Sequence, residues 1–495
     1  MHKSHLRLVV ATMAFALALV AGGCAFLLDT DSLQEGKSTA GGDGWPCADD
    51  SSCFETPTDD PCTKDWCDPV SKLCRRIPHK GLALRAESPG HDELISSQAE
   101  IGLPVLTTDA DGNFYLGYFA RQAQGGEGDV RLVRLADNAN APSVNVRLAQ
   151  VTNGIGTGHS SPGLEIVANR LRVAVAGTLS AAGQGEAGMY RFQLEKDSLT
   201  PPVQGVDQML LDKDPAYASF PARLTAPRIV RHGSRDLVLW VHQGAVFTHD
   251  WATADTTSNS FSLINATNAV PIAGGIGFKF GAVVEAESSG SDGLYIWTEG
   301  KNTLTVQLDS NSGTRLGLAS AALHPKAPTS PTLNVVHWAY HQAPEPPQLK
   351  LGGALCDLSK CTAQSFGAAA AEVAGGLWPS VDIITPDISA DQRRIVAVHS
   401  FISNNVAALL LNAYEVDAAD LAKKIPLEDL AINPSMVRVT EPQPIDDNLP
   451  SSSPYGPTAV ATTSKGKIVV AWVHHRPSGE ASLRTKRYYL DKCAP

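Results

Sequence analysis

The sequence lacks a cluster of basic residues. Its 40 lysines and arginines stand against 51 aspartates and glutamates, for a net charge of −11. After residue 24, basic residues form nothing longer than pairs such as Arg75-Arg76 and Lys423-Lys424. Proteins that bind nucleic acid need a clustered basic surface to neutralise phosphates. We therefore expect no nucleic-acid partner.

Methionine and aromatic residues are also scarce, at five methionines and 6% Phe, Trp and Tyr, whereas glycine (42) and proline (32) are abundant. Glycine and proline favour turns and destabilise the interior of helices. Hydrophobic residues make up 43% of the chain, which is enough for a large core. The composition favours a globular protein with many turns and few long helices.

The motifs of several common enzyme classes are absent. The sequence contains no Gly-x-x-x-x-Gly-Lys-Ser/Thr phosphate loop, no Gly-x-Ser-x-Gly nucleophile elbow and no His-Glu-x-x-His pair. The two carboxylates of a glycosidase cannot be singled out among 51 acidic residues. We assign no catalytic residue and expect no cofactor.

The N-terminus has the pattern of an export signal. Lys3 and Arg7 precede the apolar stretch 8–23, which is shorter than the ~20 residues of a membrane-spanning helix. The stretch ends in Ala21-Gly22-Gly23-Cys24, which resembles a bacterial lipobox, with alanine where leucine is usual. The resemblance implies that residues 1–23 are removed and that Cys24 carries lipid, so that a membrane is a partner. Plain secretion is the alternative.

The residue after Cys24 bears on the location of the protein in the cell. In the lipoprotein pattern of enteric bacteria an aspartate at this position retains the protein at the inner membrane, and here Ala25 follows instead. This favours an outer-membrane lipoprotein of the bacterial cell envelope, periplasmic or surface-exposed. Residues 24–46 are polar and rich in glycine, which predicts a flexible tether.

A cysteine-rich module is predicted over residues 47–80. Dense cysteines in an exported chain indicate disulfides, because a short polar segment has little apolar surface to bury. The run Cys62-Thr63-Lys64-Asp65-Trp66-Cys67-Asp68-Pro69 resembles the slime-mould CTDC repeat, which implies an extracellular structural module without catalysis. Zinc is disfavoured because exported thiolates oxidise, so we expect no metal. The cysteines are Cys47, Cys53, Cys62, Cys67 and Cys74.

Counting the cysteines extends this expectation. Nine cysteines less a lipidated Cys24 leave eight. Cys356 and Cys361 are close enough in sequence to join one hairpin, and Cys493 remains near the C-terminus. Since the N-terminal set is odd, we predict that Cys493 is bonded to one of its five members, and we leave that member open.

One β-strand pattern recurs from residue 102 to the end. A short strand, often after a proline, leads into a turn rich in Gly, Asp and Asn, and a strongly apolar strand follows. Such turns favour hairpins because glycine and asparagine accept positive φ angles. The apolar strands recur about every 60 residues. They are Phe114–Phe119, Leu171–Ala176, Leu237–His242, Leu294–Thr298, Val335–Tyr340, Ile395–His399 and Ile468–His474.

These strands are continuously apolar, which predicts sheets covered on both faces. Seven such units in a circle would cover each other, so we predict an all-β fold, a seven-bladed β-propeller, over residues 102–495. Six or eight blades and a tandem of β-sandwiches are the alternatives. Residues 81–101 have a weak pattern and are taken as a domain boundary, and 410–433 as a short helix or loop.

Three histidines occupy corresponding positions at the ends of apolar strands, namely His242, His399 and His474. Equivalent positions of a propeller lie on one ring, so these side chains could meet at an anionic ligand or a metal. The alternative is that each packs against its neighbouring blade. Separately, Asp109, Asp111 and Asn113 resemble the start of a calcium loop, but the later glutamate is missing and a hairpin turn is favoured.

The expected function follows from fold and address. The repeated Ser-x-Asp-x-Gly-x-x-Trp box of sialidase-like propellers is absent from this chain. We therefore favour a binding or scaffold protein that holds a protein or glycan partner on one face of the propeller. The alternative is a glycan-cleaving hydrolase or lyase, which would require carboxylates that converge and have raised pKa values.

Overall fold

The computed structural model describes residues 63–493 apart from a number of loops, the longest being 214–226, 367–379 and 418–434. Between 301 and 395 it describes backbone only. The chain divides into two compact units, residues 1–81 with 493–495, and residues 82–492. No helix occurs in the described part, so none there is long and apolar enough to cross a membrane.

The first unit contains one antiparallel hairpin of β1 (Thr63–Cys67) and β2 (Cys74–Pro78). Asp68 stabilises the connecting turn, because its carboxylate accepts hydrogen bonds from the Val70 amide (3.0 Å) and the Ser71 hydroxyl (2.7 Å). The hairpin lies in the segment that resembles the cysteine repeat.

The second unit consists of seven antiparallel sheets of four or five strands. We number the sheets as blades 1 to 7 and give their strands in spatial order, first strand first. Blade 1 has β5 (Glu100–Ile101) and β6 (Val105–Thr108), then β7 (Phe114–Arg121), β8 (Gly128–Arg134) and β9 (Val144–Val151); blade 2 has β10 (Gly163–Val167), β11 (Arg170–Thr178), β12 (Ala187–Glu195) and β13 (Gln208–Lys213); blade 3 has β14 (Arg228–His232), β15 (Arg235–His242), β16 (Ala245–Asp250) and β17 (Ser260–Leu263).

The remaining blades follow the same order along the chain. Blade 4 has β18 (Ala266–Pro271), β19 (Gly281–Ser288), β20 (Ser291–Thr298) and β21 (Val306–Asp309); blade 5 has β22 (Arg315–Pro325), β23 (Asn334–Gln342), β24 (Gln348–Cys356) and β25 (Cys361–Phe366); blade 6 has β26 (Ser380–Ile384), β27 (Gln392–Ser403), β28 (Val406–Asp417), β29 (Ser435–Arg438) and β30 (Gln443–Pro444); blade 7 has β31 (Tyr455–Thr462), β32 (Lys467–His475), β33 (Ala481–Cys493), β3 (Gly81–Ala86) and β4 (Glu93–Gln98).

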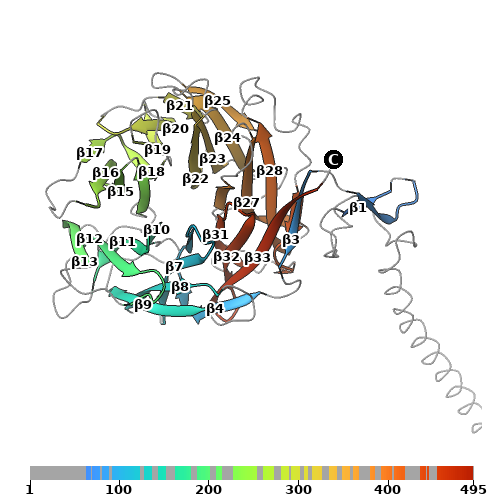
Figure 1. Cartoon of the computed structure of the whole chain (residues 1–495), viewed down its shortest axis with the longest axis horizontal. Helices are drawn as coiled ribbons and strands as arrows, with labels where there is room; N and C mark the ends of the chain where they lie inside the picture. Colours follow the sequence, from blue (N-terminus) through green and yellow to red (C-terminus); the bar gives the residue numbers. More distant parts are fainter. Residues whose placement is uncertain are drawn as a thin grey trace, which may run out of the picture. The chain divides into compact units, whose positions relative to one another are not determined.

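The seven blades form a closed ring. Contacts between neighbouring blades run from β6 to β10, β14, β18, β22, β26 and β31, and β31 in turn contacts β6. Figure 1 shows these blades arranged around one axis. The unit is therefore a seven-bladed β-propeller, which confirms the fold predicted from the repeat. Six of the seven apolar strands predicted from the sequence are the second strand of their blade.

The core lies between the blades. On β32, Ile468, Val470 and Trp472 belong to the hydrophobic cluster shared with blade 6. The alternate residues Val469 and Ala471 belong to the cluster shared with blade 1. Since both faces of the strand are covered, polar and apolar residues need not alternate. This explains the continuous apolar runs of the sequence.

The first and last strands of the propeller close the ring within blade 7. Strand β33, from the C-terminal end, pairs with both β3 and β4 from the N-terminal end. The ion pair between Arg484 and Asp92, at 2.6 Å, supports the same junction. The propeller thus begins near residue 82 rather than 102, and the predicted boundary at 81–101 is wrong. Because β3 and β4 are half-exposed outer strands, their apolar pattern is weak.

Two local predictions also differ from the structure. The apolar run Leu294–Thr298 lies on β20, the third strand of blade 4, whereas the other six runs lie on second strands. The first third of the predicted interruption at 410–433 is strand, because β28 continues to Asp417. Residues 418–433 lie outside the described part.

Candidate functional site

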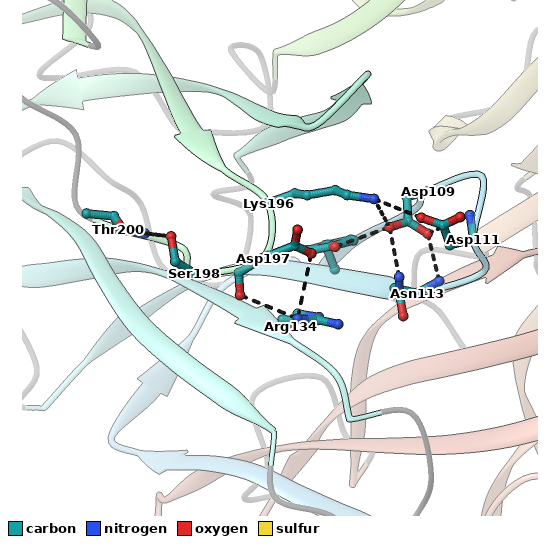
Figure 2. A network of polar contacts seen from close by, with 9 residues as sticks. Asp109, Asp111, Asn113, Arg134, Lys196, Asp197, Ser198 and Thr200 are labelled. Atoms are coloured by element: carbon teal, nitrogen blue, oxygen red, sulfur yellow. Dashed lines mark hydrogen bonds and ion pairs between the residues drawn. The ribbon is translucent and has the colours of Figure 1, made fainter.

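The hairpin turn between β6 and β7 forms one side of the candidate site. In each blade a turn connects the first strand to the second. We call the end of the ring that carries these turns the turn face. Here the Asp109 Oδ1 atom accepts hydrogen bonds from the amides of Asp111 (3.0 Å) and Asn113 (2.9 Å) (Figure 2). Gly112 has a φ of 89°, which glycine adopts without strain. The interpretation of this segment as a hairpin turn is confirmed.

Lys196, just after β12 of blade 2, fixes this turn from the side. Its Nζ atom lies 2.8 Å from Asp109 Oδ2 and 3.0 Å from Asp111 Oδ2 (Figure 2). Burial alone would raise the pKa of Asp109, but hydrogen bonds from Asn113 and Lys196 lower it to about 2. The same two aspartates raise the pKa of Lys196. An ammonium group therefore sits where the calcium alternative would place its ion.

A pocket of about 280 Å³ lies on the turn face where blades 7 and 1 meet. The turn of blade 1 and the ends of three strands of blade 7 line it. Phe114 and Val469 are buried, at 6% and 0% exposure, and form an apolar part of its wall. The side chains that give the pocket its polar character are Glu87, Asp111, Asn113, Lys467, Arg487 and Tyr489.

The two acidic groups of the pocket are already engaged. Glu87 Oε1 accepts a hydrogen bond of 2.9 Å from the Tyr489 hydroxyl. Burial, and then this hydrogen bond, raise the pKa of Tyr489. The guanidinium of Arg487 lies between two glutamates, 3.7 Å from Glu87 Oε2 and 3.5 Å from Glu93 Oε2. The carboxylates are thus held in fixed positions around the pocket.

A second group of charged residues joins blades 2 and 3 at the turn face. Asp236 at the start of β15 pairs with Arg172 at 2.5 Å and with Arg231 at 3.8 Å. Glu165 on β10 stands opposite Arg172 in the strand register. Burial, and then the charge of Asp236, raise the pKa of Glu165 to about 7 against the opposing effect of Arg172. This cluster brings a readily protonated carboxyl near a carboxylate that is paired with two arginines.

The three predicted histidines lie on second strands of blades 3, 6 and 7. His242 is 3% exposed and packs 6.2 Å from the ring of Phe247. His474 is half-buried beside Tyr455, and burial followed by nearby arginines lowers its pKa. The side chain of His399 is not described. Over the described residues, no group of three or more His, Cys, Asp or Glu is placed to hold a metal ion, and the ligand role of these histidines stays a prediction.

The cysteines are placed only in part. Cys493 is buried and disulfide-bonded. Cys67 faces Cys74 across β1 and β2, and Cys356 faces Cys361 across β24 and β25. Directly opposed residues have Cα atoms about 4.5–5.5 Å apart, within the range of disulfides. The Cys356–Cys361 bond and the partner of Cys493 stay predictions, and the sequence left the pairing of Cys67 and Cys74 open. Cys24, Cys47, Cys53 and Cys62 lie outside the described residues.

Sequence reasoning missed most of the pocket. Glu87 lay in the segment taken as a boundary, and the recurring apolar strands include neither Arg487 nor Tyr489. Lys196 follows a strand of another blade. The one available signal was the turn chemistry, which singled out Asp111 and Asn113, because the other residues meet only through ring closure.

Comparisons with known proteins identify no family for this propeller. No family model matches the chain, and no curated protein matches it. Solved structures give distant likenesses. The NanB sialidase of Streptococcus pneumoniae has 10% identity and a TM-score of 0.39, over 82% of this chain and 70% of that one.

Two further likenesses have similar values. The α-L-arabinanase of Penicillium chrysogenum has 9% identity and a TM-score of 0.39, over 80% of this chain and 97% of that one. The WD40 domain of SCAP from fission yeast has 9% identity and a TM-score of 0.34, over 82% and 98%. Likenesses this weak carry no argument, and the assignment of the fold rests on the seven sheets.

Proposed function

We propose that this chain is an outer-membrane-anchored lipoprotein of the bacterial cell envelope, and that its propeller binds a protein or glycan partner at the turn face. The address is supported by the export pattern of residues 1–23 and by the lipobox-like ending at Cys24. A lipid anchor followed by a polar tether of about 20 residues would hold the propeller some 25 Å from the membrane surface.

The pocket between blades 7 and 1 is the observation that carries the binding role. It combines an apolar wall with charged and hydroxyl groups whose positions are held by hydrogen bonds and ion pairs. Ligand sites commonly have this character, apolar lining with a few placed polar groups. The surrounding sheets form a closed ring, which is a rigid support for such a site.

Binding is tested with a glycan array and with purified envelope proteins, using the whole chain. Ala136→Trp places a bulky ring in the pocket from a half-buried lining position, and Ala136→Ser is the matched control. The proposal expects a defined partner to bind the wild type and Ala136→Ser, and to be lost from Ala136→Trp. A chain that binds nothing, or binds equally well with the pocket filled, contradicts it.

The address is tested separately by labelling cells with palmitate and by fractionating their membranes. Label should enter the wild type and leave Cys24→Ala unlabelled, and the labelled chain should sediment with the outer membrane. Incorporation of label into Cys24→Ala, or recovery of the unlabelled wild type in the medium, contradicts a lipid anchor at this residue.

Glycan cleavage is the second candidate, because of Glu165. A carboxyl with a pKa of about 7 close to the side chain of Asp236 has the character of a general acid with a second carboxyl group nearby. Release of sugar by the wild type from polysaccharides of the envelope, with a loss of 100-fold or more in Glu165→Gln, would support it. Equal activity of the two proteins would exclude Glu165 as the acid.

A further inference from the structure

In the pocket between blades 7 and 1 the acidic side chains have partners among the residues that the structure describes, whereas one basic side chain has none there. Glu87 is held by Tyr489 and Arg487, and Asp111 is held by Lys196. Lys467 lines the same pocket at the start of β32. No ion pair of its ammonium group occurs among the described contacts. A positive charge thus remains available.

Arg487 is a second basic side chain of the pocket that is only partly paired. Charge-assisted hydrogen bonds are about 2.7–2.9 Å long, whereas its two contacts with glutamates are 3.7 and 3.5 Å. Its Nη1 atom is buried and makes no hydrogen bond within the described part of the chain. An anion entering the pocket would find cations without displacing a shorter contact. A cation would have to compete with Lys196 for Asp111 or with Tyr489 for Glu87.

The backbone around Lys467 is well fixed. Its amide donates to Thr463 Oγ1 at 3.1 Å, and its carbonyl accepts from the Thr463 amide at 2.9 Å. Gly466 in this turn has a φ of 78° and its amide donates to the Thr463 carbonyl at 3.0 Å. The ammonium group is therefore carried by a rigid hairpin end, and its stem is half-buried.

The size and the wall of the pocket limit the body of the ligand. At about 30 Å³ for each water in the liquid, 280 Å³ corresponds to about nine waters, and so to a ligand of about ten non-hydrogen atoms. Phe114 and the half-buried Ala136 offer carbon surface for a ring or a short chain. An inorganic anion would leave that surface uncovered.

We propose that this pocket binds a small carboxylic acid of amino-acid or sugar-acid size, with its carboxylate on Lys467 beside Arg487 and its carbon body against Phe114 and Ala136. The inference rests on the proposed binding function and names the chemical class of the group recognised. The same carboxylate chemistry can come from a sugar acid or from an amino acid, and the choice of probes separates these sources.

Titration calorimetry of the whole chain tests the assignment with two matched pairs of probes. Glucuronate is compared with glucose, and N-acetylalanine with its amide. At least one acid should bind at millimolar concentration or below while its neutral partner binds at least tenfold more weakly. Binding of neither acid, or equal binding of an acid and its neutral partner, would overturn the proposal.

Variants identify the cation. Lys467→Met keeps much of the stem and should weaken binding of the acid about tenfold or more, a loss typical of one ion pair in a partly buried site. Lys467→Arg should restore most of it. Lys465→Met is the matched control, because Lys465 is exposed in the same turn and outside the pocket. Equal loss in both methionine variants would contradict a local contact.

The carboxylate assignment and the proposed binding function can be contradicted separately. A partner that binds the wild type, is lost from Ala136→Trp and binds Lys467→Met normally would leave the pocket as the binding site and remove the carboxylate from it. Unchanged melting temperatures of the variants without ligand would show that the losses come from binding rather than from folding.

Discussion

Replacing Glu165 with glutamine should stabilise the propeller at alkaline pH and leave it unchanged at acid pH. The pKa of Glu165 is raised from 4.5 to about 7, chiefly by burial. The folded state therefore retains a proton that the unfolded state has released at intermediate pH. The stabilising effect of protonation is complete below pH 4.5 and is lost as pH rises through 7. Glutamine remains neutral and has nearly the same shape.

The magnitude follows from the difference between the two pKa values. About 2.5 pH units at 1.36 kcal/mol each correspond to about 3 kcal/mol above pH 8, as an upper value. For a unit of residues 82–492, the entropy of unfolding is about 0.9 kcal/mol/K, so the melting temperature should rise by about 3–4 °C. At pH 4.5 the two proteins should melt together.

Differential scanning calorimetry between pH 4.5 and 8.5 measures this effect. Glu195→Gln is the control, because Glu195 is an exposed residue of β12 that pairs with Arg170 at the surface. Its melting temperature should follow that of the wild type across the range. A Glu165→Gln protein whose melting temperature shifts equally at both ends of the range, or falls only at pH 8.5, would refute the assigned burial and charge environment.

Three further results are expected. Asp109→Ala should lower the free energy of unfolding by about 3–5 kcal/mol, because it leaves the nearly buried Lys196 without its main partner. Asp111→Ala should cost less than about 1 kcal/mol, because that aspartate side chain is 74% exposed. Urea unfolding compares the two variants, and equal losses would contradict the difference in burial. Gly163→Ala should cost about 1–3 kcal/mol, since a Cβ atom would lie 2.7 Å from a backbone carbonyl of blade 3, and an unchanged melting temperature would show that the blades can separate there. Peptide mapping without reduction should find Cys493 in a disulfide, as it is in the structure. Because Cys67 and Cys74 face each other, its partner should be Cys47, Cys53 or Cys62. A free thiol at Cys493, or a bond to Cys67 or Cys74, would contradict this.

Most of the ring could be predicted because its signal is local. The second strand Phe114–Arg121 is buried along its whole length between two neighbours. The second strands of blades 2, 3 and 7 are buried at most of their positions, and this requires similar apolar residues in each. The hairpin turns were found for a related reason, since glycine and carboxamide side chains satisfy turn geometry within a few residues. The exception at Leu294–Thr298 arose because third strands are covered as well, so periodicity alone could not tell the second strand from the third.

The candidate site was much less accessible to the same reasoning. Glu87 and Arg487 lie 400 residues apart in the sequence, and they meet because a half-exposed strand from the N-terminal end completes the last blade. Nothing in the pattern around Glu87 marks that pairing. Lys196 likewise reaches Asp109 from another blade, and its hydrogen bond adds to that of Asn113 in lowering the pKa of that aspartate.

Composition and spacing along the chain were thus enough for the export pattern, the odd number of N-terminal cysteines and a repeating all-β architecture, because each depends on neighbours in sequence. Folding added the ring closure within blade 7, the pocket at its seam with blade 1 and the environment of Glu165. These depend on electrostatic and packing interactions between segments hundreds of residues apart, which take effect only once the blades have come together.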